Sequence, residues 1–229
     1  RETAARVAAG AIAAMILEEY GIKTTAYTLK AAGIQCTKKD FAAIEQNTMR
    51  APDNEAAKLM EEKVDEYRRK GESTGGIIEC VVKGVPAGFG EPVFDKLDAD
   101  IAKAILSIGA VKGIEFGAGF AAADSTGSEN NDKMRLANGK PVFETNNAGG
   151  ILGGISNGND IVFRLAVKPV PSIFKNQETI CKTDNGFEET DLEIKGRHDV
   201  CLCPRIVPVV EAMTNIVIAD MILRNRCSK

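Results

Sequence analysis

Residues 204–226 read PRIVPVVEAMTNIVIADMILRNR, a long segment whose apolar side chains cover most faces of a helix. Residues 1–20, RETAARVAAGAIAAMILEEY, are rich in helix formers and are also apolar on nearly every face. A helix that is apolar all round is expected to be buried. The two ends of the chain therefore predict a pair of core helices. Because Glu211, Asn215 and Asp220 interrupt the second one, we expect no membrane span.

Helical and strand-like segments alternate irregularly between these ends. Helices are predicted at 53–71 and 94–109, strands at 22–35, 77–85, 111–120, 160–173, 179–182 and 188–195, and a long polar loop at 121–148. This order favours an α+β fold in which the terminal helices are buried between antiparallel sheets. No linker-like tract divides the chain, so we expect a single domain over residues 1–229.

The composition is that of an ordinary globular protein, with 44% hydrophobic and 27% charged residues. A formal net charge of −3 offers no attraction for nucleic acid or an anionic membrane. The six cysteines lack the two-residue gap of zinc and redox motifs, so we expect reduced cytoplasmic thiols and no metal site. The chain opens without methionine or an apolar leader, from which we expect a processed or truncated product.

The segment 146–160, NNAGGILGGISNGND, contains two glycine pairs separated by Ile151 and Leu152. Paired glycines permit positive φ and leave backbone N–H groups open to a flat or anionic ligand. A tight glycine-rich turn explains the same segment equally well. The nearby GAGFAA at 117–122 matches a dinucleotide fingerprint, but a polar loop follows where that fingerprint needs a helix, so no Rossmann site is predicted.

The motif KPVPS, at 168–172, ends a predicted strand with two prolines that stiffen the backbone beside Lys168. A rigid backbone next to a lysine favours a phosphate contact. A lysine at a strand end is nevertheless most often simply solvated.

The motif GRHD, at 196–199, would place Arg197 and Asp199 on one face if its backbone is extended. The arginine would then keep the carboxylate ionised, which makes Asp199 a candidate base. An ordinary surface ion pair is the commoner explanation of such a motif. His198 is the only histidine, which excludes a Ser-His-Asp triad or a multi-histidine metal site within this chain.

Five stretches in order, RETAARVAAGAIA, VKGIEFGAGF, NNAGGILGGISNG, KPVPSI and GRHDVCLCPRIVPVVEAM, resemble chorismate synthase from Arg1 to about Leu223. The resemblance implies a lyase of the shikimate pathway to the aromatic amino acids. Such an enzyme converts 5-enolpyruvylshikimate 3-phosphate to chorismate by 1,4-anti elimination of phosphate, and it needs reduced FMN without net redox change. The resemblance also implies a β-α-β sandwich, a homotetramer and a cytoplasmic flavoprotein. NADP is a further expected association, while the source of the reducing equivalents stays open.

The family's functional residues carry over onto the matching motifs. The expected FMN contacts are Gly109, Ala110, Gly153, Lys168, Pro169, Val170, Pro171, Ser172 and Arg197. Arg1 and Arg197 resemble the arginines that bind substrate phosphate or carboxylate. Asp199 resembles the aspartate that handles the proton on flavin N5.

Two departures from the family pattern matter. Val200 stands where the family usually has proline after GRHD, which we expect to affect the backbone more than the chemistry. The family also carries a further N-terminal part with catalytic histidines and more substrate-binding arginines. We therefore expect residues 1–229 to be the C-terminal portion of such an enzyme and to be inactive alone. The alternative is a non-catalytic flavin-binding, anion-binding or assembly module that retains the fold.

Overall fold

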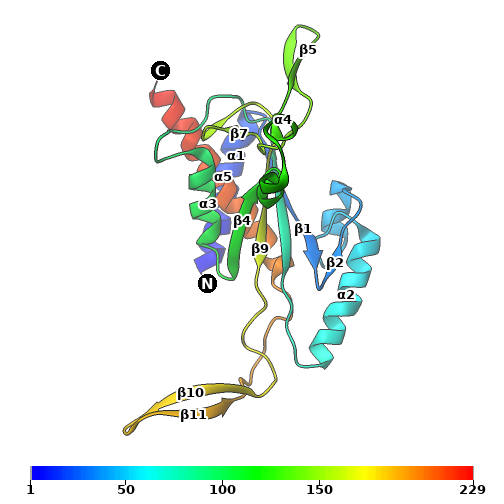
Figure 1. The fold of residues 1–229 in the computed structure, drawn as a ribbon, viewed down its shortest axis with the longest axis vertical. Helices are drawn as coiled ribbons and strands as arrows, with labels where there is room; N and C mark the ends of the chain where they lie inside the picture. Colours follow the sequence, from blue (N-terminus) through cyan, green and yellow to red (C-terminus); the bar gives the residue numbers. More distant parts are fainter. Residues whose placement is uncertain (1, 229) are drawn as a thin grey trace.

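The structure, a computed structural model, describes residues 2–228 (Figure 1). The α-helices are α1 (Glu2–Glu19), α2 (Asn54–Arg69), α3 (Leu97–Leu106), α4 (Gly127–Asn130) and α5 (Cys203–Cys227), and the 3-10 helices are η1 (Phe41–Gln46) and η2 (Gly119–Asp124). The strands are β1 (Lys23–Ala31), β2 (Ile34–Gln35), β3 (Gly76–Lys83), β4 (Val111–Phe116), β5 (Met134–Ala137), β6 (Lys140–Phe143), β7 (Ile151–Leu152), β8 (Ile155–Ser156), β9 (Ile161–Val167), β10 (Gln177–Thr183) and β11 (Gly186–Leu192).

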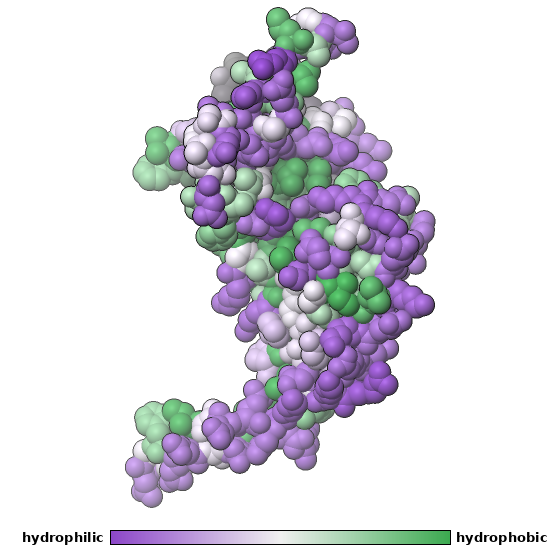
Figure 2. Space-filling model, turned by 45° about the vertical axis from the view of Figure 1, so that its right-hand side comes forward, coloured by the Kyte–Doolittle hydropathy of each residue, from purple (hydrophilic) through white to green (hydrophobic). Residues whose placement is uncertain are grey.

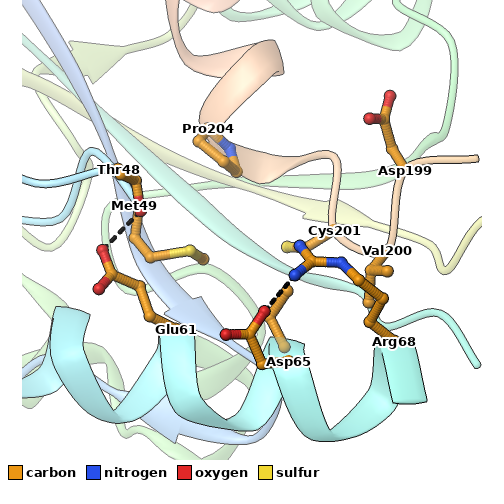
Figure 3. Close-up of a pocket in the computed structure, with 10 residues that line it drawn as sticks. Thr48, Met49, Glu61, Asp65, Arg68, Asp199, Val200, Cys201 and Pro204 are labelled. Atoms are coloured by element: carbon orange, nitrogen blue, oxygen red, sulfur yellow. Dashed lines mark hydrogen bonds and ion pairs between the residues drawn. The ribbon is translucent and has the colours of Figure 1, made fainter. Parts of the chain in front are cut away.

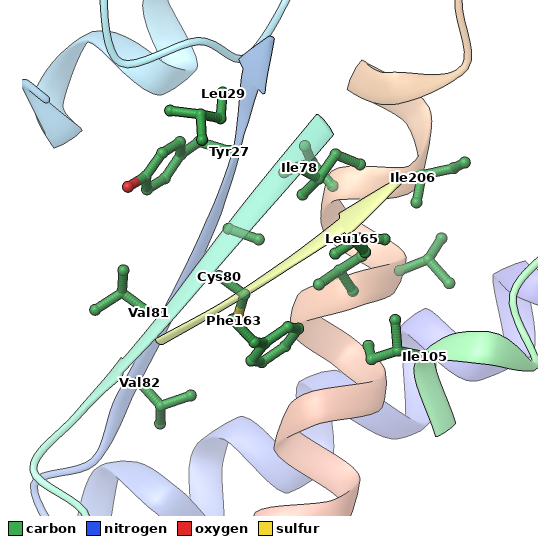
Figure 4. Close-up of a cluster of buried hydrophobic side chains, with 14 of the residues drawn as sticks. Tyr27, Leu29, Ile78, Cys80, Val81, Val82, Ile105, Phe163, Leu165 and Ile206 are labelled. Atoms are coloured by element: carbon green, nitrogen blue, oxygen red, sulfur yellow. The ribbon is translucent and has the colours of Figure 1, made fainter. Parts of the chain in front are cut away.

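One antiparallel sheet of five strands organises the fold, in the order β2-β1-β3-β9-β4. Strand β9 is inserted between β3 and β4, and its Phe163 lies opposite Cys80 on one side and Phe116 on the other. Because side chains alternate along a strand, Ile78, Cys80, Phe163 and Leu165 all point to the face that α5 covers (Figure 4).

Helix α5 fills the centre of the apolar layer, with β1 and β3 on one side and α1 and α3 against its other faces. The helices α1 and α5 are in close contact at Gly10, where a Cβ would lie 2.3 Å from Cα of Ala212. A side chain on residue 10 would therefore collide with backbone, and glycine is what allows the two helices to cross here. The predicted α+β class is confirmed.

Burial of the two terminal helices differs from the expectation. Helix α5 is buried along most of its length, whereas α1 exposes Ile12 and Met15 at 64% and 69%. The expectation that α1 is buried on all sides is therefore wrong. The reason is that α5 covers one side of α1, and no second large sheet covers the other side within residues 2–228.

Helix α5 is the one described helix that is long and apolar enough to cross a membrane. Its most apolar window is 61% buried within the fold, as in the core helix of a globular protein, so length and composition are weak support for a span. The polar interruption at Glu211 has a structural role instead. Its Oε1 accepts a hydrogen bond of 2.8 Å from the N–H of Ala26, on the edge of β1. Burial raises the pKa of Glu211 above its usual value.

The opposite face of the sheet carries a buried polar group on β3. The hydroxyl of Tyr27 donates to the carboxylate of Glu79, and Nζ of Lys39 lies 2.5 Å from Oε1 of the same carboxylate. Burial first, and then this hydrogen bond, raise the pKa of Tyr27. The ring of Phe41, in η1, lies 5.4 Å from the ring of Tyr27 and closes over the pair.

Two hairpins extend beyond this body. The segment predicted as one polar loop at 121–148 contains η2, α4 and the exposed β5–β6 hairpin. The β10–β11 hairpin forms a long, largely hydrophilic arm that projects from the end of the molecule opposite β5 (Figures 1 and 2). All six cysteines are free thiols, so disulfides do not stabilise either hairpin.

Asp53 connects the start of α2 to the loop that precedes η1. Its Oδ1 accepts hydrogen bonds from the N–H groups of Glu55 and Ala56, and its Oδ2 accepts them from Thr37 and Lys38. These donors, with Ala56 as the largest contribution, lower the pKa of the buried Asp53 to about 2.

We predict that Asp53→Ala lowers the free energy of unfolding by about 1–3 kcal/mol at pH 7, because it removes the helix cap and leaves buried N–H groups unpaired. A carboxyl whose pKa is depressed on folding stabilises the protein above its ordinary pKa. The difference between wild type and variant should therefore shrink as the pH falls from about 4 towards 2. Urea unfolding at several pH values measures it. Asp40→Ala, which removes an exposed cap of η1, is the control and should cost less.

We predict that Gly10→Ala destabilises the protein by about 1–3 kcal/mol, because the added methyl group collides with Ala212 in α5. Helix propensity alone predicts the opposite sign, a gain of about 1 kcal/mol, so the direction of the change is decisive. Thermal or urea unfolding measures it, with Ala9→Gly on the exposed side of α1 as the control for propensity. A more stable Gly10→Ala variant would contradict the close helix contact.

Candidate functional site

The GRHD segment lies between the β10–β11 arm and the first turn of α5. The next residue, Val200, accepts a 2.8 Å hydrogen bond at its carbonyl from the N–H of Thr74, and Cys201 forms a parallel bridge with Thr74. These contacts fix Val200 and Cys201, directly after GRHD, beside the start of β3.

Asp199 forms its ion pair with a residue that the sequence did not indicate. Its Oδ1 lies 3.1 Å from Nη2 of Arg205, in the first turn of α5, and within the described residues Arg197 makes no ion pair. The expected pairing of Arg197 with Asp199 is therefore wrong. The reason is that α5 begins at Cys203 and its first turn brings Arg205 back beside the loop, so local alternation did not decide the contact.

His198 contributes to packing at the base of the arm. Its ring lies 5.2 Å from the ring of Phe174, and its Nε2 is 3.3 Å from the carbonyl oxygen of Ile194. The half-buried imidazole thus holds the two ends of the arm together. Within residues 2–228 no cluster of three or more histidine, cysteine or acidic side chains could bind a metal ion.

The KPVPS segment lies directly beside the predicted Gly109–Ala110 contact. The N–H of Lys168 donates to the carbonyl of Ala110 at 2.9 Å, and Ala110 has a positive φ of 72°. Two of the predicted FMN-contact segments, far apart in sequence, are therefore neighbours in the structure. The turn before β3 holds the same segment, since Oγ of Ser73 donates to the carbonyl of Val170 at 2.6 Å.

Two cavities flank Asp199. The first, which we call the Met49 cavity, has a volume of about 320 Å³ and extends from Met49 and Glu61 to Asp199 and Pro204. Figure 3 shows this cavity, with Asp65 and Arg68 at the end of α2 and Asp199 on the chain that leads into α5.

The second cavity, which we call the Arg197 cavity, has a volume of about 420 Å³. Ser172 and Arg197 line it together with Asp199, so it brings three of the predicted site residues together. Arg68 and Asp199 border both cavities. Arginine, serine hydroxyl and backbone groups around one cavity suit a phosphate or carboxylate ligand.

Other predicted residues lie elsewhere. Gly153 is in the β7–β8 turn, next to Gly154, whose carbonyl accepts from the N–H of Leu97 at the start of α3. Gly109 follows the other end of α3, and a helix of 10 residues is about 15 Å long. The structure therefore does not bring Gly153 together with the Ala110 and Lys168 pair.

Arg1 lies outside the described residues. The first turns of α1 are nevertheless placed by Arg6, whose Nη1 donates to Oγ of Ser107 at 2.7 Å and whose Nε pairs with Glu2 at 2.6 Å. Ser107 directly precedes the Gly109–Ala110 segment. The start of α1 and this segment are therefore neighbours.

Sequence reasoning missed Arg68, Ser73 and Arg205. The stretch YRRKGES at 67–73 reads as the charged end of a surface helix, and PR at 204–205 reads as an ordinary helix start. The proline at the first helical turn was the one usable signal, since it places Arg205 where a side chain can reach the preceding loop.

Known proteins resemble this chain over almost its whole length. A family model described as chorismate synthase matches residues 1–223. Chorismate synthase from Methanosarcina mazei is 54% identical over 229 residues, which cover 98% of this chain and 62% of the relative. The relative from Desulfatibacillum aliphaticivorans is 55% identical over 98% of this chain and 61% of its own length. The relative from Archaeoglobus fulgidus is 53% identical over 97% and 62%.

A solved structure described as "Crystal Structure of Chorismate Synthase" superposes with a TM-score of 0.81 at 32% sequence identity. The match covers 98% of this chain and 64% of that chain. The chain thus spans 61–62% of the length of these three curated relatives.

Proposed function

This chain belongs to the chorismate synthase family, and on that premise we propose that the full-length protein converts 5-enolpyruvylshikimate 3-phosphate to chorismate. The reaction is the 1,4-anti elimination of phosphate, catalysed by a carbon–oxygen lyase with reduced FMN. The observation that carries the proposal is the Arg197 cavity, which joins the family's KPVPS and GRHD motifs around one space.

The residues around the Arg197 cavity suit a flavin phosphate and an anionic substrate. Arg197 lines this cavity, and Lys168 lies in the KPVPS motif, whose Ser172 lines it. Neither cation has a carboxylate ion-pair partner within the described residues, so both charges are free to bind a phosphate or carboxylate. Pro169 and Pro171 keep the segment beside Lys168 stiff, which lowers the entropy lost on binding. When bound, reduced FMN would supply the electron-rich ring that the family reaction requires without net redox change.

We assign separate roles to the predicted residues. Arg197 would bind phosphate or carboxylate, Asp199 would hold the proton exchanged with N5 of a bound flavin, and the backbone of Gly109 and Ala110 would contact the cofactor. Arg205, beside Asp199, keeps a positive charge next to that carboxylate. Gly153, Arg1, the homotetramer, the cytoplasmic location and the association with NADP stay expectations of the family resemblance.

The rival proposal is a non-catalytic flavin-binding, anion-binding or assembly module. It predicts that the full-length protein forms no chorismate. If the module serves only assembly, the full-length protein also binds no FMN. The enzyme proposal predicts both activities, and it predicts that they depend on the same cavity.

We predict that the full-length protein binds FMN and that Arg197→Ala weakens binding roughly 10- to 100-fold, because a hydrogen-bonded charge is lost. Asp199→Ala should also weaken binding strongly. Quenching of FMN fluorescence measures the dissociation constants. Arg135→Ala, an exposed arginine paired with Glu144 on the β5–β6 hairpin, is the control and should leave affinity unchanged. Equal affinity of wild type and Arg197→Ala would reject the assigned cavity.

We further predict that residues 1–229 alone form no chorismate, whereas the full-length protein does. The single histidine, His198, is occupied in packing against Phe174, so the chain has no other imidazole for proton transfer near neutral pH. A chorismate assay with reduced FMN, on samples whose intact mass has been verified, compares the two species. Turnover by the 229-residue species would refute the prediction.

A further inference from the structure

The turn of residues 71–74, between α2 and β3, contacts the KPVPS motif and the residue that follows GRHD. Towards KPVPS, Oγ of Ser73 donates to the carbonyl of Val170 at 2.6 Å. Just beyond that motif, the N–H of Phe174 donates to the carbonyl of Gly71 at 3.0 Å. Towards GRHD, the N–H of Thr74 donates to the carbonyl of Val200 at 2.8 Å. One short turn is therefore hydrogen-bonded both to the KPVPS motif and to Val200, the residue that follows GRHD.

This turn packs closely against the backbone of Phe174. Gly71 has a φ of 69°, and a Cβ at this position would lie 2.8 Å from the carbonyl oxygen of Phe174. A non-glycine residue here would meet both strain and collision. The ion pair of Glu72 with Lys175, at 2.5 Å, adds a second connection on the exposed side.

The KPVPS segment depends on such an external contact. Pro169 and Pro171 have no N–H group, so the segment cannot be held by an ordinary backbone ladder. Its first residue, Lys168, is held by Ala110 at 2.9 Å, and the carbonyl of Pro171 accepts only a long contact of 3.4 Å from Gln177. The short Ser73 bond to Val170 is thus the main hydrogen bond at the centre of the motif.

We propose that Ser73 is a positioning residue for the cofactor: its hydroxyl fixes Val170 so that KPVPS and GRHD face the same ligand. The inference rests on the proposed function, because it assumes that these motifs bind FMN. Ser73 itself lines the Arg197 cavity and is half-buried, so its bond to Val170 connects the wall of that space to the KPVPS motif. A fixed wall lowers the ordering cost of binding.

The test is FMN titration of the full-length protein by fluorescence quenching, with the melting temperature of the cofactor-free protein measured in parallel. Ser73→Ala should weaken FMN binding roughly 3- to 10-fold, the range expected for one hydrogen bond. Ser73→Cys, which keeps the side-chain size but is a weak donor, should behave alike and covers the case in which Ser73→Ala does not fold. Ser73→Thr keeps the hydroxyl and should recover affinity.

Thr37→Val is the matched control, because it removes a hydroxyl hydrogen bond to Asp53 at the far end of α2, about 24 Å away for 16 residues. It should lower the melting temperature and leave FMN affinity unchanged. Unchanged affinity in Ser73→Ala, an equal loss in Thr37→Val, or no recovery in Ser73→Thr would each overturn the positioning role and leave the proposed function standing. Absence of FMN binding by the wild type would overturn both.

Discussion

The close contact of α1 with α5 at Gly10 and Ala212 is the constraint on which the rest of the structure depends. It joins the two ends of the chain into one helical layer, and the sheet covers that layer from one side. With α5 placed, Glu211 occupies the edge of β1, and the first turn of α5 carries Arg205 to Asp199. With α1 placed, Arg6 reaches Ser107 beside the Gly109–Ala110 segment. The candidate site thus lies around the ends of two helices, and the packing of these helices against each other determines their positions.

Local patterns were sufficient for the long helices and most of the longer strands, but they missed the short elements at 121–148 and could not give the arrangement. The apolar runs at 1–20 and 204–226 predict core helices because burial leaves its mark on every face of a helix. These runs do not predict that α1 is covered on one side only, because an apolar helix surface can pack against any apolar partner. Likewise, the strand pattern at 160–173 predicts β9, but its place between β3 and β4 depends on pairings distant in sequence.

Some residues of the candidate site could be predicted from local sequence and others could not. The sequence identifies KPVPS and GRHD as candidate site segments, because closely spaced prolines and a glycine followed by opposite charges stand out within a short stretch. Ser73 and Arg205 do not belong to any conspicuous sequence motif. Ser73 matters because it bonds to the carbonyl of Val170, and Arg205 because it pairs with the carboxylate of Asp199. Local sequence patterns do not reveal either contact. Gly153 shows the converse. Its motif is conspicuous, yet the structure puts it beside the start of α3, away from Lys168.

The position of β9 has a consequence for how the nascent chain behaves on the ribosome. Strands β3 and β4 are both made before β9, so β3 keeps one unpaired edge and β4 has no partner strand in the sheet until residues 161–167 are synthesised. Helix α5, which packs against β1 and β3, is made after all of these strands. Open strand edges and uncovered apolar surface are what holdase chaperones and aggregation both recognise. Translation of α5 therefore ends a period in which strand edges and apolar surface are exposed, and this period follows from the order of the strands in the sheet.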